Sequence, residues 1–369
     1  MAIYDLAIRG ATVVDRLGRN PIRADVAVRN GRIAAIGEVG KDAREIVDAG
    51  GLALTPGISD LHTHYDAQVT WDATLSPSPS LGVTTAIMGN CGFGIVPSPP
   101  HLRDLIMRNL AVVEGMDLDA LRAGIDWRFQ SFAEYMAMLR GRGPYINLGV
   151  LVGHSAVRTA VIGEDASVRK EPTAAELAEM KRLVAEAMDQ GAVGLGASYS
   201  LNHSGWSGVP MPSTISDISE FDALVGAMGG PGRGVVEISS GPIMPDAMEE
   251  IAARYGRPIF MSTAVALYNE QYSERALGVF DACAAAQGRG NELYIQITAN
   301  RCRSISHWRA PTRSTAIRRS TRSRRMTASS STRCSATGAS ASGSAPTCAT
   351  PSRAQSSRAT GSASSSPRR

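Results

Sequence analysis

The sequence predicts an α/β fold: an incomplete TIM-like (β/α)₈ barrel of about seven strands, with a small β-module before it and a disordered tail after it. Over residues 53–300, short apolar runs alternate with amphipathic segments, which is typical of a parallel sheet covered by helices on both faces. Residues 1–52 alternate apolar and polar positions instead, and residues 301–369 lose both patterns. We therefore divide the chain into these three parts.

The composition fits a loop-rich enzyme. The chain has 369 residues, of which 43% are hydrophobic, and it contains 37 Gly and 19 Pro. Its first residues, MAIYDLAIRG, lack the basic and apolar regions of a signal peptide, and no apolar run reaches the roughly 18 residues that a membrane helix needs. The five cysteines show no C-x-x-C spacing. We expect no membrane partner, reduced thiols and a cytoplasmic location.

The N-terminal part reads as short strands. It begins with YDLAIRGATVVD, which alternates around apolar positions, and continues to ADVAVRNGRIAAIGE. The Asn30-Gly31 pair lies between two alternating runs, and this arrangement is the strongest short-range signal for a β-hairpin. Residues 1–52 are thus predicted to form a small β-module and not the beginning of a dinucleotide-binding fold.

Seven apolar runs predict the barrel strands. They are LALTPGISDLH, GVTTAIMGNC, INLGVLVGH, GAVGLGASYS, GVVEISS, PIFMSTAV and LYIQITAN. The clearest helix between them is TAAELAEMKRLVAEAMDQG, where Thr173 and Glu176 offer a capping box and Gly191 follows the last turn. Seven strands are one short of a closed barrel.

The tail differs from the rest of the chain in charge. It holds 14 Arg and 19 Ser but no Lys, Asp or Glu, so residues 1–300 carry all 34 acidic side chains against 24 basic ones. A segment of this composition cannot bury a core. Three interpretations of this tail are open: it is an arm that binds nucleic acid, a disordered tail, or the product of a frameshift.

We favour the frameshift and expect no nucleic-acid partner. Codons for Cys302 to Ala316 can be chosen so that a neighbouring frame reads VPFDLTLASAYPLYS, which is far more protein-like than the visible sequence.

Chemically reactive side chains follow several predicted strands, at the rim where barrels of this kind carry out chemistry. In chain order they are His62, His64, Cys91, His154, Tyr199 and His203. An H-x-H pair in a strand directs both imidazoles to one side, where they form either half of a zinc site or the wet face of an edge strand. The shared rim favours the metal site.

Four features together resemble the amidohydrolase superfamily, and within it the D-aminoacylase (N-acyl-D-amino-acid deacylase) branch. They are the N-terminal β-module and the segments PGISDLHTHYDAQ, GVTTAIMGNCGFG and GHSAVR, within a resemblance that covers about residues 3–300. The resemblance implies a zinc-bearing metallo-dependent hydrolase barrel and a β-sandwich built from both chain ends. It also implies hydrolysis of the amide bond of N-acylated D-amino acids.

The same resemblance implies the metal ligands. His62 and His64 would bind from the first strand and Cys91, as a thiolate, from the second, holding one Zn²⁺ or two ions. Zinc with such ligands keeps a position open for water, lowers the pKa of that water to about 7 and polarises the scissile carbonyl. For Cys91 the alternative is a small buried hydrophobe behind a turn.

Three further rim residues are candidates to bind the N-acyl amino acid substrate. His154 would orient it or cap a strand end. His203 would contact it or simply face solvent. Tyr199 would wall the acyl pocket or pack in the core.

Two departures from the family's pattern bear on activity. The family usually supplies histidines after its fifth and sixth strands, but the matching positions here are Ser239, Ser240, Ser262 and Thr263. A metal site is therefore mononuclear or weak unless His203 or Glu237 substitutes. The catalytic Asp that the family places after its eighth strand has no counterpart, because the Ser/Arg tail stands there, so no catalytic residue is assigned.

The sequence thus leads to a metal-dependent amidohydrolase for N-acyl-D-amino acids, impaired in this form. The alternatives are a cyclic-amide hydrolase of the hydantoinase or dihydropyrimidinase kind, and an inactive fragment. Cys91 argues against the cyclic-amide hydrolase, because those relatives usually bridge two metals with a carboxylated lysine. The preferred acyl group and the oligomeric state do not follow from the sequence.

Overall fold

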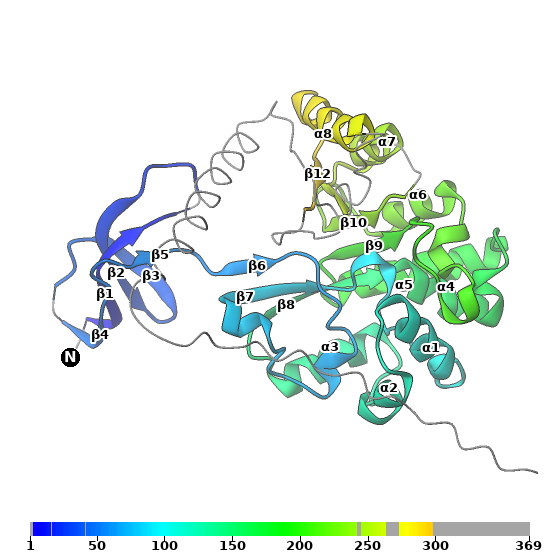
Figure 1. The fold of residues 1–369 in the computed structure, drawn as a ribbon, viewed down its shortest axis with the longest axis horizontal. Coiled ribbons are helices and arrows are strands. Elements are labelled where there is room, and N and C mark those ends of the chain that lie inside the picture. Colours follow the sequence, from blue (N-terminus) through cyan, green and yellow to red (C-terminus); the bar gives the residue numbers. More distant parts are fainter. Residues whose placement is uncertain (1–2, 16, 41, 242–244, 263–272, 298–369) are drawn as a thin grey trace, which may run out of the picture. The chain divides into compact units, whose positions relative to one another are not determined.

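The computed structural model describes residues 3–15, 17–40, 42–241, 245–262 and 273–297 (Figure 1). These residues form two sheets, a five-stranded one in the N-terminal part and a seven-stranded one beyond it. The tail predicted at 301–369 lies outside the described residues. No helix of the described ranges combines the length and the apolar character needed to cross a bilayer.

The N-terminal sheet has the strand order β3-β2-β1-β4, and β5 also pairs with β1. Its strands are β1 Tyr4–Val13, β2 Ile22–Arg29, β3 Arg32–Gly37, β4 Ala43–Asp48 and β5 Ala53–Leu54. The predicted hairpin is confirmed, since β2 and β3 pair antiparallel around Asn30 and Gly31, whose φ values of 50° and 70° suit a tight hairpin turn. The described N-terminal residues form this one sheet, and the sandwich that the resemblance implies stays a prediction.

All seven strands predicted for the barrel are present, parallel and in sequential order from β6 to β12. They are β6 Ile58–Asp60, β7 Val83–Met88, β8 Asn147–Gly153, β9 Gly194–Ser198, β10 Val235–Ser239, β11 Ile259–Ser262 and β12 Leu293–Ile295. All five residues of β9 are buried, which explains why such strands read as continuous apolar runs. The incomplete barrel fold is confirmed.

The first predicted strand, residues 52–62, divides between the two sheets. Its beginning is β5, which pairs with β1, and its end is β6, which pairs with β7. Pro56 and Gly57 separate the two pieces, because proline has no N–H for a ladder and glycine weakens a strand. A Cβ on Gly57 would lie 1.9 Å from Thr84 Oγ1, so only glycine fits at this approach to β7.

α-Helices connect the successive strands from β7 to β12. They are α1 Arg103–Val113, α2 Leu118–Gly124, α3 Phe132–Arg142, α4 His154–Ile162, α5 Ala174–Asp189, α6 Ile218–Ala227, α7 Pro245–Tyr255 and α8 Ser273–Gly288. Short 3₁₀ turns are η1 Gln68–Thr70, η2 Ser78–Leu81, η3 Asn90–Gly92, η4 Pro100–Leu102, η5 Gly163–Ser167, η6 Trp206–Gly208 and η7 Pro212–Ile215. The predicted helix at 173–191 is α5, and its capping box between Thr173 and Glu176 is present.

Candidate metal centre

His62 and His64 lie just beyond β6, which ends at Asp60, and so stand at the end of the first barrel strand as predicted. Asp60 Oδ1 accepts a hydrogen bond from the His62 N–H at 3.2 Å. Between the two histidines, Thr63 donates its N–H and its hydroxyl to the Ile87 carbonyl of β7, at 3.0 and 2.7 Å. The flanking imidazoles come together, with ring centroids 5.2 Å apart.

Cys91 follows β7 in a tight turn. Gly89, Cys91 and Gly92 have φ values of 85°, 55° and 74°, all in the left-handed region. A Cβ on Gly92 would lie 2.9 Å from the Gly196 carbonyl oxygen, so glycine lets this turn pack directly on β9. The turn buries Cys91, which is 3% exposed.

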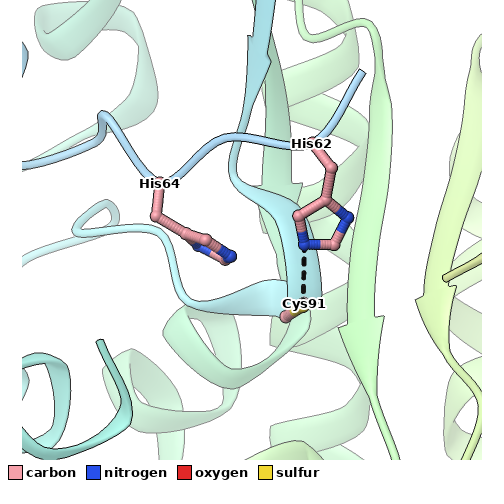
Figure 2. Close-up of side chains that lie close together, drawn as sticks. All are labelled: His62, His64 and Cys91. Atoms are coloured by element: carbon pink, nitrogen blue, oxygen red, sulfur yellow. Dashed lines mark hydrogen bonds between the residues drawn. The ribbon is translucent and has the colours of Figure 1, made fainter. Parts of the chain in front are cut away.

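The structure brings the three predicted metal ligands together (Figure 2). One ligand atom from each of His62, His64 and Cys91 lies within 4.8 Å of the others. His62 Nε2 is 3.4 Å from Cys91 Sγ. On a tetrahedral zinc ion, with Zn–N near 2.0 Å and Zn–S near 2.3 Å, these two atoms would be about 3.5 Å apart. The spacing of His62 and Cys91 therefore fits two ligands of one ion, and His64 lies within 4.8 Å of both.

The electrostatics of the cluster suit a cation. Burial, with smaller contributions from His62 and His203, lowers the pKa of His64 to about 3, so its imidazole is neutral and free to ligate. Burial also raises the pKa of the Cys91 thiol well above its usual value, and the Glu237 carboxylate raises it further. A bound metal ion would deprotonate such a thiol and release the proton.

Glu237 is a buried carboxylate on strand β10, with 2% of the residue exposed. Its Oε2 accepts a 2.6 Å hydrogen bond from the Cys91 N–H. Its Oε1 has no hydrogen-bond partner in the described part of the chain and lies 3.6 Å from His62 Nδ1. A buried carboxylate beside the His62 imidazole and the turn that carries Cys91 fits a site that holds a positive ion.

Serine side chains occupy the positions where the resemblance implies histidines. Ser239 Oγ is 3.2 Å from Cys91 Sγ and 2.7 Å from Ser262 Oγ. Thr263 lies outside the described residues. The described donor set is thus two imidazoles and one thiol that a metal ion would ionise, and three protein ligands are the count of a catalytic zinc site with one position left for water.

Each candidate histidine ligand also has a side-chain oxygen atom near its Nδ1. His62 Nδ1 is 2.9 Å from Gln296 Oε1, and His64 Nδ1 is 3.4 Å from Glu114 Oε1. Burial, helped by the nearby Asp66 carboxylate, raises the pKa of Glu114 to about 7. Sequence reasoning missed Gln296 and Glu114. A polar residue inside the run LYIQITAN was the signal for Gln296, whereas nothing local distinguishes Glu114.

His203 lies at the edge of this cluster, in the loop after β9. Its Nδ1 is 2.6 Å from Ser198 Oγ. Its ring meets Phe93 edge to face at 5.0 Å, and Phe93 stacks on His64 at 6.1 Å. Phe93 therefore contacts both His203 and the candidate ligand His64.

The structure places His154 and Tyr199 in packed surroundings. His154 begins α4, is fully buried, and its Nε2 is 2.6 Å from Glu220 Oε1. Arg158 binds the other oxygen of the same carboxylate. Tyr199 is buried, with its hydroxyl 3.0 Å from Ser216 Oγ. A substrate contact for either residue stays a prediction. Sequence reasoning missed Glu220, because an acid in the first turn of a helix is usually exposed.

The comparisons with known proteins agree with this geometry. Residues 45–298 match the profile of the amidohydrolase family. D-aminoacylase of Alcaligenes xylosoxydans xylosoxydans is 36% identical over 203 residues, which is 53% of this chain and 38% of that protein. N-acyl-D-glutamate deacylase of the same organism is 32% identical over 254 residues, which is 68% of this chain and 47% of that protein.

A solved structure is similar over most of the described residues. N-acyl-D-glutamate deacylase of Bordetella bronchiseptica, complexed with zinc and a phosphonate inhibitor, matches with a TM-score of 0.64 at 27% identity, covering 80% of this chain and 59% of that one. The chain spans less than half the length of the two curated relatives. Because the family profile covers well over half of the chain, the protein belongs to the amidohydrolase family, and to its D-aminoacylase branch.

Proposed function

We propose that this chain is a zinc-dependent amidohydrolase that hydrolyses the amide bond of N-acyl-D-amino acids. The observation that carries the proposal is the convergence of His62, His64 and Cys91 at the carboxyl ends of adjacent parallel strands. The names of the similar proteins, D-aminoacylase and N-acyl-D-glutamate deacylase, support the substrate class. A solved deacylase with bound zinc supports the metal.

The residues of the site have different roles in metal binding and substrate binding. His62, His64 and Cys91 would hold the ion, which when bound supplies a water of pKa near 7 and polarises the substrate carbonyl. Phe93 lies against both His64 and His203 and offers an apolar wall at the edge of the cluster. His203, with Nδ1 fixed by Ser198, presents its remaining ring nitrogen for a polar contact with substrate.

We infer that turnover by this form is impaired. The family resemblance calls for a carboxylate after an eighth strand, to take a proton from the water and pass it to the leaving amine. Residues 298–369 contain no Asp or Glu that could serve. General acid–base catalysis typically contributes about 10²–10⁴-fold, so a loss of that order is expected relative to an intact relative.

The test uses the purified full chain. After treatment with a chelator and reconstitution with zinc, metal content is measured by mass spectrometry, and release of free amino acid is measured from N-acetyl-D- and N-acetyl-L-amino acids. We expect zinc to bind, a His62→Ala and His64→Ala double variant to lose it, and any slow turnover to favour the D-substrates. A wild-type chain that retains no zinc would refute the metal-dependent mechanism. Hydrolysis of a hydantoin without deacylation would favour the cyclic-amide alternative.

A further inference from the structure

Gln296 connects the end of β12 to the loop that follows β6. Its Oε1 lies 2.9 Å from His62 Nδ1, and its Nε2 donates to the Leu61 carbonyl oxygen at 3.4 Å. In the described part of the sheet these two strands are opposite edges and do not pair with each other. One side chain therefore contacts a candidate metal ligand and the residue before it, from more than 230 residues away.

The Leu61 carbonyl determines which way the Gln296 amide points. A carbonyl oxygen can only accept a hydrogen bond, so the amide must turn its NH₂ group toward Leu61. The opposite orientation would place two oxygen atoms against each other and leave the amide NH₂ beside His62. The amide oxygen of Gln296 therefore faces the His62 ring.

This orientation in turn determines where the His62 ring carries its proton. The amide oxygen of Gln296 is an acceptor, so His62 Nδ1 must be the donor. The unpartnered Oε1 of Glu237, 3.6 Å from the same nitrogen, favours a proton there as well. In a neutral imidazole with a proton on Nδ1, the lone pair lies on Nε2. That is the nitrogen that lies 3.4 Å from Cys91 Sγ.

We propose that Gln296 is a positioning residue, which holds the proton of His62 on Nδ1 and so keeps Nε2 available for a metal ion. The consequence for metal binding rests on the proposed function, whereas the assignment of the proton does not. The interaction has the form seen at many metal sites, in which the second nitrogen of a ligating histidine donates to an oxygen that fixes the ring. The seventh strand thereby becomes part of the metal centre.

A simpler role would be to support β12, and Gln287 provides the matched control. Gln287 lies on α8, and its Nε2 donates to the Leu293 carbonyl oxygen of β12 at 2.8 Å. Gln287→Met and Gln296→Met make the same chemical change, and each removes an amide that contacts the β12 segment or the loop beside it. Only Gln296→Met removes the acceptor for His62.

The first measurement is the tautomer of His62 in the metal-free full chain, by ¹⁵N NMR at about pH 8, where an ordinary imidazole is neutral. We expect the wild type and Gln287→Met to carry the proton on Nδ1, and Gln296→Met to show a mixture of tautomers. A wild-type His62 with its proton on Nε2 overturns the proposal without any variant. So does a Gln296→Met protein whose tautomer is unchanged.

The second measurement is zinc affinity, by competition with a chromophoric chelator, with folding monitored by circular dichroism. We expect Gln296→Met to bind zinc about 10–100-fold more weakly than the wild type, the usual effect of removing such an outer partner, and Gln287→Met to bind like the wild type. If both variants lost zinc affinity equally, Gln296 would only support β12, and the proposal would be overturned. A wild type that binds no zinc would instead refute the proposed function, and the NMR result would still decide the role of Gln296.

Discussion

The backbone N–H of Cys91 donates a 2.6 Å hydrogen bond to Glu237 Oε2, although 146 residues separate the two in sequence. Glu237 belongs to β10, whereas Cys91 lies in the turn after β7. The carboxylate therefore fixes the turn that carries a candidate thiolate ligand. Burial raises the pKa of this carboxyl, and its ionised form would place a negative charge directly beside the cluster that would bind a cation.

Glu237→Gln separates these two roles. The glutamine amide oxygen can still accept the Cys91 N–H, but the charge that offsets a bound cation is gone. We expect zinc affinity to fall by about 10–100-fold. The free energy of unfolding of the metal-free protein should not decrease, because a neutral amide costs less to bury than a carboxylate and keeps the hydrogen bond from the Cys91 N–H. Chelator competition and urea denaturation measure the two quantities. Glu250→Gln, at an exposed position of α7, is the control. If zinc affinity is unchanged in Glu237→Gln, the only role of Glu237 at this site is its hydrogen bond with the Cys91 N–H.

Cys91→Ser tests the thiolate directly. A serine hydroxyl does not ionise under conditions where a metal deprotonates a thiol, so we expect zinc affinity to fall by more than the roughly 10–100-fold typical of an outer partner. With Co²⁺ as the probe, the sulfur-to-cobalt charge-transfer band should disappear. Cys283→Ser, at a second buried cysteine on α8, should keep both the affinity and the band. A band that survives in Cys91→Ser would exclude Cys91 as a ligand.

The fold could be predicted from the sequence because its signals are local. The central parallel strands β8 and β9 are buried over most or all of their length and therefore appear as apolar runs. The capping box of α5 and the Asn30-Gly31 turn depend on residues close in sequence. The exception is the first run, which Pro56 and Gly57 divide between two sheets, because apolar character alone does not say which sheet a strand joins.

The candidate site could be predicted only in part. His62, His64 and Cys91 follow strands that are adjacent in the sheet, so topology alone brings them together. Their supporting partners come from distant elements: Gln296 follows β12, and Glu114 follows α1. Which side chains meet there depends on how the sheet curls and where α1 ends, and neither leaves a periodic signal in the sequence.

Gly92→Ala tests the backbone that carries Cys91. At φ of 74°, any Cβ is strained, and here it would also lie 2.9 Å from the Gly196 carbonyl oxygen. Gly115→Ala is the matched control, because Gly115 has a φ of 64° and no atom within 4 Å of a Cβ. We expect Gly115→Ala to cost about 1–2 kcal/mol of unfolding free energy, and Gly92→Ala about 1–3 kcal/mol more because of overpacking. Equal costs in urea denaturation would show that the turn can move away from β9.

The buried cluster of His154, Arg158 and Glu220 supports the last prediction. Glu220 Oε1 is 2.6 Å from His154 Nε2, its other oxygen binds Arg158, and all three residues are at most 3% exposed. Burial alone would raise the pKa of Glu220, but the hydrogen bond from His154 and the charge of Arg158 hold it below its usual value of 4.5. The folded protein therefore favours the ionised carboxylate.

Glu220→Gln should destabilise the fold by about 3–5 kcal/mol at neutral pH, because it leaves the buried Arg158 without a counter-charge. The sign of the pH dependence follows from the lowered pKa. Ionised Glu220 stabilises the wild type fully above the unfolded pKa of 4.5, and this contribution is lost as the pH falls through the lower folded value. The difference between wild type and Glu220→Gln in urea denaturation should therefore shrink below about pH 4.5.

Glu186→Gln is the control for Glu220→Gln, because Glu186 pairs with Arg182 at 2.8 Å on the exposed face of α5. Solvent screens that pair, so its loss should cost less than about 1 kcal/mol. If the loss of unfolding free energy in Glu220→Gln does not change with pH, Glu220 stabilises the fold through packing and not through its charge. The position of His154 would then depend on packing and not on the charge of Glu220.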